Sequence, residues 1–153
     1  MSDVETAGGA IIEIGSATPA TFDKAGYDLL TWTEIGEVSN ISGDLGKVFS
    51  LATFNLLKER GIIKRKGSYN NGSINVEYGY HRSDNGQAAL VTAANADATY
   101  PFKITLEDAD TTEIFFMAMP MGAPINIGGA DDFLTSSVNL EVDSESDVLF
   151  EDP

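Results

Sequence analysis

Residues 70–121, NNGSINVEYGYHRSDNGQAALVTAANADATYPFKITLEDADTTEIFFMAMPM, decide the fold, because they predict a hairpin, a short helix and a second hairpin in succession. The pair Asn71-Gly72 is a strong signal for a two-residue type I′ turn, which needs positive φ at both central residues. We therefore predict that 61–69 and 73–80 pair as antiparallel strands on either side of this turn.

Apolar and polar residues alternate along two of the predicted strands, 73–80 and 100–107. Successive side chains of a strand point to opposite faces, so each of these strands would turn one apolar face toward the core. The residues predicted to form this core face are Ile74, Val76, Tyr78, Phe102, Ile104 and Leu106.

A short helix is predicted between the two hairpins, at about 84–94. Asp84 and Gln87 occupy the N-cap and N3 positions of a start that resembles a capping box. Leu90, Val91 and Ala94 follow at helical spacing. The pattern indicates a mainly β protein with one small helix packed on a half-apolar sheet.

The second hairpin is predicted to turn at 108–112 and return through 113–121. Both faces of this returning strand are apolar: one carries Phe115, Met117, Met119 and Met121, and the other carries Ile114, Phe116 and Ala118. A strand that is apolar on both faces must be covered twice, by the protein's own core or by another subunit.

The remaining strands are expected at 11–14, 29–38 and 134–142. The stretch 42–60 has no clean apolar period, and we expect an extended excursion there.

We find no internal repeat and no linker, which indicates a single domain over 1–153. A mobile arm is predicted at 1–9 and an acidic tail at 143–153. Within this tail, residues 148–150 are apolar enough to dock on the domain.

The composition is that of a globular chain, with 153 residues of which 42% are hydrophobic. No apolar run approaches the roughly 20 residues of a membrane span, and the first residues lack the features of a signal peptide. We therefore expect no membrane partner. The absence of cysteine excludes disulfides and thiolate metal sites and favours synthesis in a cytosol.

Charge is unevenly distributed along the chain, whose net charge is −15. Such an acidic protein repels nucleic acid over much of its surface, which argues against sequence-specific DNA binding. The basic residues concentrate in one short run that contains Lys58, Arg60, Lys64, Arg65 and Lys66. Three interpretations of this run remain open: a nucleic-acid patch, a solvated loop, or a basic projection that meets an acidic surface of an identical copy.

No catalytic, metal or cofactor motif stands out. His81 is the sole histidine, and a surface or capping role accounts for it. The sequence from Asp108 begins like a calcium loop, but Glu113 replaces the required glycine and Met119 stands where a ligating acid is needed, so a hairpin turn explains it better. We expect a protein that is not an enzyme and uses no cofactor.

A series of local strings occurs along about 31–142. They are Trp32 with Ile35-Gly36-Glu37-Val38 and Ile41-Ser42-Gly43, the stretch Gly67–Gly72 leading into Ile74–Tyr80, Asn85–Leu90, Tyr100–Ile104 and Glu113–Met121. In their order and spacing, rather than in any single string, they resemble the tail tube proteins of long-tailed, non-contractile bacteriophages.

The resemblance implies a β-sandwich or barrel-like subunit with one flanking helix. It also implies that six copies form a ring, that rings stack into a hollow tube, and that double-stranded DNA passes through the tube during ejection. The implied location is the virion tail, after synthesis in the host cytoplasm. The implied partners are further copies of the chain and tail proteins such as the tape measure, terminator and distal tail proteins.

The same resemblance assigns inter-subunit or inter-ring contacts to the long loop at 44–66. Because the basic residues concentrate in this loop, we expect them to make such contacts with acidic surface on a neighbouring copy. It identifies no catalytic residue and does not say which residues face the lumen. Two alternatives remain open at this point. One is a monomeric binding module, such as a carbohydrate-binding or virion decoration β-sandwich, and the other is a terminator or baseplate protein of related fold.

Overall fold

The computed structural model describes residue 6 and residues 8–144 and 146–152. The arm predicted at 1–9 therefore lies largely outside the described residues. The elements, in chain order, are β1 (Ile11–Gly15), α1 (Lys24–Asp28), β2 (Trp32–Glu34), β3 (Val38–Asn55), β4 (Ile62–Gly79), α2 (Asn85–Asn95), β5 (Tyr100–Thr105), β6 (Glu113–Pro120), β7 (Ile125–Asn126), β8 (Thr135–Val142) and β9 (Leu149–Glu151).

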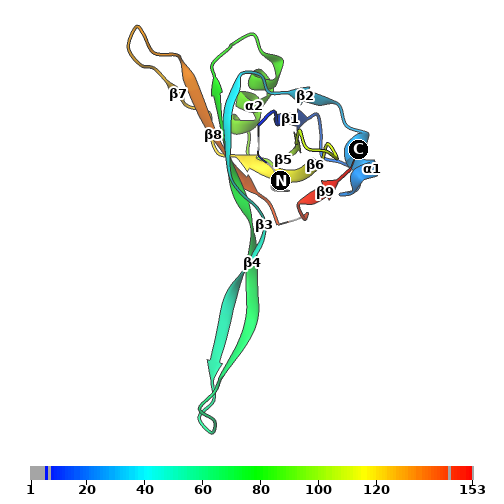
Figure 1. The fold of residues 1–153 in the computed structure, drawn as a ribbon, viewed down its shortest axis with the longest axis vertical. Coiled ribbons are helices and arrows are strands. Elements are labelled where there is room, and N and C mark those ends of the chain that lie inside the picture. Colours follow the sequence, from blue (N-terminus) through cyan, green and yellow to red (C-terminus); the bar gives the residue numbers. More distant parts are fainter. Residues whose placement is uncertain (1–5, 7, 145, 153) are drawn as a thin grey trace.

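All strands of the described chain join in one antiparallel sheet, in the order β2-β1-β5-β6-β8-β4-β3, with β7 added to β8 and β9 added to β6. The mainly β fold class is confirmed. Figure 1 shows a body that contains β1, β2, β5, β6 and the two helices, from which the β3–β4 hairpin extends as a long arm. A second, shorter projection follows β7 and leads into β8 at the other end of the molecule (Figure 1).

The main core gathers the apolar faces of β1, β4, β5, β6 and β8 beneath α2. Five residues of the predicted core face are less than 6% exposed, and Leu106 packs partly buried against the same cluster. Phe102 and Phe116 stack across β5 and β6, with ring centroids 5.8 Å apart. Each fully buried side chain of this size contributes about 1.5–3 kcal/mol to folding.

Helix α2 begins directly after Asp84, the residue that the sequence predicted as its N-cap. The Asp84 carboxylate accepts hydrogen bonds from the backbone N–H groups of Gln87, at 2.9 Å, and of Gly36, at 3.0 Å. The Gln87 side chain does not return a bond to Asp84, as a capping box would require. It accepts from the backbone of His81 and donates to the carbonyls of Gly36 and Gly79, so it ties the helix to the β2–β3 connection and to the end of β4.

The prediction of a hairpin turn at Asn71-Gly72 is wrong. Strand β4 runs through these residues without reversing, and the chain turns instead at 56–61, between β3 and β4. Gly72 does adopt a positive φ of 98°, but as part of an irregularity where β3 carries one residue more than β4. The long loop predicted at 44–66 is for the same reason mostly two paired strands.

The second hairpin is confirmed, with β5 and β6 paired from Tyr100–Ala118 to Thr105–Glu113. Its turn is stabilised by the Asp108 carboxylate, which accepts from the backbone N–H of Thr112 at 2.9 Å and from its hydroxyl at 2.8 Å. These hydrogen bonds favour the charged carboxylate and lower the pKa of Asp108 below its usual value.

The chain itself covers part of the second apolar face of β6. Phe115 and Met117 are buried against Tyr27 of α1, a helix that the sequence did not predict, and Leu149 of β9 packs on the same cluster. Tyr27 and Phe115 stack with centroids 4.9 Å apart, and burial raises the pKa of Tyr27. Strand β9 places the apolar part of the acidic tail on β6. Met119 and Met121, which continue this face, remain 39% and 62% exposed, so the chain covers only the part of the face around Phe115 and Met117.

Candidate interaction surface on the projecting hairpin

The β3–β4 hairpin leaves the body of the protein next to Ser73, the first residue of β4 in chain order that pairs with β8. From there to the turn at 56–61, the two strands pair only with each other within the described chain. Twelve residues separate Leu45 from Leu57, so at about 3.3 Å per residue the arm extends roughly 40 Å. Figure 1 shows it projecting away from every other element.

Glycines shape the base of the arm. A Cβ on Gly43 would lie 2.3 Å from the Ser73 carbonyl oxygen, and one on Gly72 would lie 2.1 Å from the Asp44 carbonyl oxygen. Both glycines have positive φ, of 124° and 98°. The two backbones therefore approach each other more closely at this bend than any other residue type permits.

Asn71 anchors the arm to the C-terminal segment. Its buried side-chain amide donates to the carbonyl of Asp143 at 3.0 Å and to that of Ser146 at 3.3 Å. Asn71, which was predicted to form a turn, is thus a buried residue whose amide hydrogen-bonds to carbonyls more than 70 positions away in the chain.

Beyond this base, the arm is a two-faced ribbon. Directly paired residues of antiparallel strands lie on the same face. Phe54 pairs with Ile63 and Ala52 pairs with Arg65, whereas Thr53 pairs with Lys64 on the opposite face. Phe54 is 65% exposed and Leu57, at the tip, is completely exposed. A two-stranded ribbon is by itself only marginally stable in water, and its exposed apolar groups make this end of the arm a candidate interaction surface.

The structure brings all five predicted basic residues together at the distal end of this arm. Lys58 and Arg60 lie in the turn, and Lys64, Arg65 and Lys66 follow in β4. None of them forms an ion pair with another described residue.

The lysines of the body are paired instead. Lys24 contacts Asp28 at 3.1 Å, Lys47 at the arm base contacts Asp147 at 3.1 Å, and Lys103 contacts carboxylates of two strands. The distal end of the arm therefore carries uncompensated positive charge, while the rest of the protein carries the excess of acids.

Two aromatic residues lie next to bases of the arm, an arrangement that the sequence did not predict. Phe49 and Tyr69 pair across the arm with centroids 5.5 Å apart. The Lys66 ammonium lies 4.9 Å from the Phe49 ring, and that of Lys47 lies 4.7 Å from Tyr69. The only signal in the sequence is apolar residues spaced along 48–63, and irregular register obscures their alternation.

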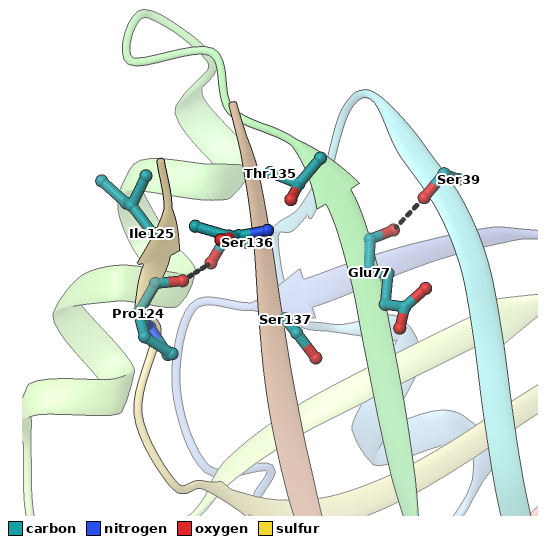
Figure 2. Close-up of a pocket in the computed structure, with 8 residues that line it drawn as sticks. Ser39, Glu77, Pro124, Ile125, Thr135, Ser136 and Ser137 are labelled. Carbon is teal, nitrogen blue, oxygen red and sulfur yellow. Dashed lines mark hydrogen bonds between the residues drawn. The ribbon is translucent and has the colours of Figure 1, made fainter. Parts of the chain in front are cut away.

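A cavity of about 490 Å³ lies beside β7 and β8, and Figure 2 shows its lining. Its serine hydroxyl groups are engaged within the protein: Ser136 donates to the Pro124 carbonyl at 2.8 Å, Ser39 to the Glu77 carbonyl at 3.2 Å (Figure 2), and Ser137 to the Asn75 side chain at 2.9 Å. Glu77 is the one charged residue among those that line it. These groups form no nucleophile–base pair.

His81 lines a different hollow, with Tyr80, Arg82 and Gln87, at the start of α2. Within the described residues no group of three or more histidines and acids is arranged to hold a metal ion. Neither described helix has the length and apolar character needed to cross a membrane.

No protein-family model and no curated protein sequence matches the chain. Comparison with solved structures shows that the fold is one found in components of phage-like tails.

Three of these structures illustrate the likeness. A chain of the anti-feeding prophage baseplate matches with a TM-score of 0.68 at 13% identity, covering 99% of this chain and 98% of that one. A chain of the PVC sheath/tube terminator, from an extracellular contractile injection system, matches at 0.67 with 14% identity and 98% coverage of both. The SPP1 tail tube protein matches at 0.62 with 18% identity, covering 94% of this chain and 77% of its own.

Proposed function

We propose that the protein is a structural subunit of a phage-like tail tube, in which six copies form a ring and rings stack into a hollow tube. The observation that carries the proposal is the tail-tube-like fold, which extends over nearly the whole chain in the matched structures. Six-fold symmetry is a feature of the anti-feeding prophage baseplate and of the tail of the gene-transfer-agent (GTA) particle among these structures.

The arm is the feature that joins copies in this proposal. Residues 56–66 contain five bases and one acid, a net charge of +4. Because the net charge of the whole chain is −15, the remaining residues carry −19. Opposite charges on two parts of one molecule steer identical copies into head-to-tail contact. Contacts of this kind that do not close on themselves produce stacked or helical assemblies.

Passage of double-stranded DNA through the lumen and a location in the virion tail follow from the same proposal. An acidic inner wall suits transit, because a wall that bound phosphates would slow the DNA. The tape measure, terminator and distal tail proteins are the expected partners at the two ends of such a tube.

Electron microscopy and light scattering of the purified protein test the proposal. Tubes of varied length, with six-fold symmetry in end views, are the expected result. Particles that remain monomers of 16.3 kDa at every concentration, with or without other tail components, would contradict it and favour a monomeric binding module.

A terminator or baseplate protein is a second candidate, because two of the matched chains come from such assemblies. The same experiment separates the two candidates: a tube subunit grows into tubes of indefinite length, whereas a terminator forms single rings that bind the end of a preformed tube.

A further inference from the structure

The base of the arm contains a bulge in β3. Two residues of β3, Gly46 and Lys47, stand opposite Asn71 alone in β4. A bulge of this kind bends the strand that carries it. Gly46 has a φ of 131° with open space where a Cβ would lie, and Gly72, next to Asn71, has a φ of 98°. A bulge with two glycines in conformations that other residues rarely adopt has the features of a hinge.

Neither the sheet nor the core fixes the direction of the arm at this hinge. Strand β4 pairs with β8 only from Ser73 onward, and beyond that point the two strands of the arm pair with each other. Where the hairpin joins the body, Gly43, Leu45 and Ile74 line an apolar cavity of about 230 Å³. Side chains that face a cavity lack part of the close contact that would hold them in place. The direction of the arm therefore depends on other contacts at its base.

The connection between β8 and β9 supplies these contacts. Both strands pair with β6, Val142 opposite Ala118 and Leu149 opposite Phe115. Residues 143–148 join the two strands, whereas 116–117 cover the same interval on β6, so the connection is four residues longer than a continuous strand. The extra length lets it leave the sheet and reach the base of the arm (Figure 1).

The connection, which the structure describes at 143–144 and 146–148, contacts both strands of the arm at the bulge. Asn71 of β4, 1% exposed, donates from its amide to the carbonyls of Asp143 and Ser146. Lys47 of β3 contacts the carboxylate of Asp147 at 3.1 Å. Since buried hydrogen bonds are stronger than exposed ion pairs, Asn71 contributes more than Lys47 and Asp147, whose side chains are 38% and 65% exposed.

We infer that the connection between β8 and β9 is a clasp that fixes the direction of the arm in the free subunit, with Asn71 as its principal residue. The inference goes beyond the proposed function, because it concerns a single subunit before any partner binds. With the clasp closed the arm has one direction, and without it the arm swings about Gly46 and Gly72. On an arm of roughly 40 Å, a rotation of about 10° at the base displaces the tip by about 7 Å.

A distance measurement between two spin labels tests the clasp, because the native chain contains no cysteine to compete for the label. Thr53→Cys places one label on the arm and Thr92→Cys places the other on α2, and both positions are exposed. Double electron–electron resonance is recorded at a concentration where light scattering shows monomers, with excess unlabelled protein. The chain without further substitutions should give one narrow distribution of distances.

Removal of the buried half of the clasp should release the arm. Asn71→Ala removes both hydrogen bonds to the connection and should broaden the distribution at least about twofold. Asn75→Ala is the matched control, since Asn75 lies in the same strand but accepts its hydrogen bond from Ser137 of β8. It should leave the width nearly unchanged. Circular dichroism verifies that both variants fold.

The exposed half of the clasp gives an independent readout. Asp147→Lys replaces the ion pair by a repulsion and should broaden the distribution by about half. Asp152→Lys makes the same change of charge beyond β9, outside the clasp, and should leave the native width.

The outcomes decide the inference without reference to assembly. Equal widths for Asn71→Ala and Asn75→Ala, or a native distribution already as broad as that of Asn71→Ala, would overturn the clasp. If Asn71→Ala does not fold, Asp147→Lys decides, and a native width for this variant would overturn it. Each of these results leaves the proposed function standing, because that proposal depends on whether tubes form.

Discussion

Reversing the charge of Lys64, Arg65 and Lys66 to glutamate should stop tube growth and leave the subunit folded. The three side chains are exposed and form no ion pair with described residues. Among the described residues, their replacement removes only the contact of the Lys66 ammonium with the Phe49 ring and the hydrogen bond from Arg65 to the adjacent Lys64 carbonyl. The net charge of residues 56–66 changes from +4 to −2, the same sign as the rest of the protein.

The size of the effect follows from the weakness of exposed ion pairs. Each contributes about 0–1 kcal/mol, and a reversal replaces that attraction by a repulsion of similar size. Three reversals at about half the upper value weaken association by about 3 kcal/mol, which corresponds to roughly 150-fold in the critical concentration. A single Lys64→Glu change should give only about threefold to tenfold.

The assay is sedimentation or light scattering at a series of protein and salt concentrations. Native assembly should weaken as salt rises, because the screening length is about 8 Å at physiological ionic strength. Arg82→Glu, an equivalent single reversal away from the arm, is the matched control for Lys64→Glu. Normal tubes from the triple variant, together with loss of DNA binding, would refute the reasoning and identify the arm as a nucleic-acid contact.

Three further predictions concern the monomer. Val76→Asp should prevent folding, because an unpaired buried carboxylate costs several kcal/mol, whereas Ser42→Asp should melt nearly as the native protein does in circular dichroism. Gly72→Ala should lower the urea midpoint far more than Gly46→Ala, since both have positive φ but only the former meets backbone atoms. The hydrogen bonds that lower the pKa of Asp108 stabilise the fold while its carboxylate is charged, above about pH 4, and this stabilisation is lost as further acidification protonates it. The Asp108→Asn variant should therefore lose less stability on acid titration than the native protein does.

Local patterns predicted the elements whose causes are local. The alternation along 73–80 and 100–107 placed two strands and their buried faces, because a strand that covers a core must present apolar groups at every second position. Asp84 marked the start of α2, and the turn after β5 depends on Asp108 bonding to Thr112 four residues later. In each case the cause lies within a few residues of its effect.

Asn71 and Gly72 show where such reasoning fails. Positive φ at Gly72 suits both a turn and an irregular strand, and only the contacts decide between them. Asn71 is buried because its amide bonds to the distant carbonyls of Asp143 and Ser146. No property of the neighbouring sequence contains this information.

The sequence by itself determined a mainly β chain, its core-facing residues and the concentration of bases at 58–66, since composition and period are properties of the chain alone. The tertiary structure decided that this basic run projects roughly 40 Å from the body, that Tyr27 and β9 cover Phe115 and Met117 on the outer face of β6, and that an apolar cavity lies at the base of the arm. These features arise between segments far apart in the chain, where strand register and packing, which no local pattern encodes, set the distances.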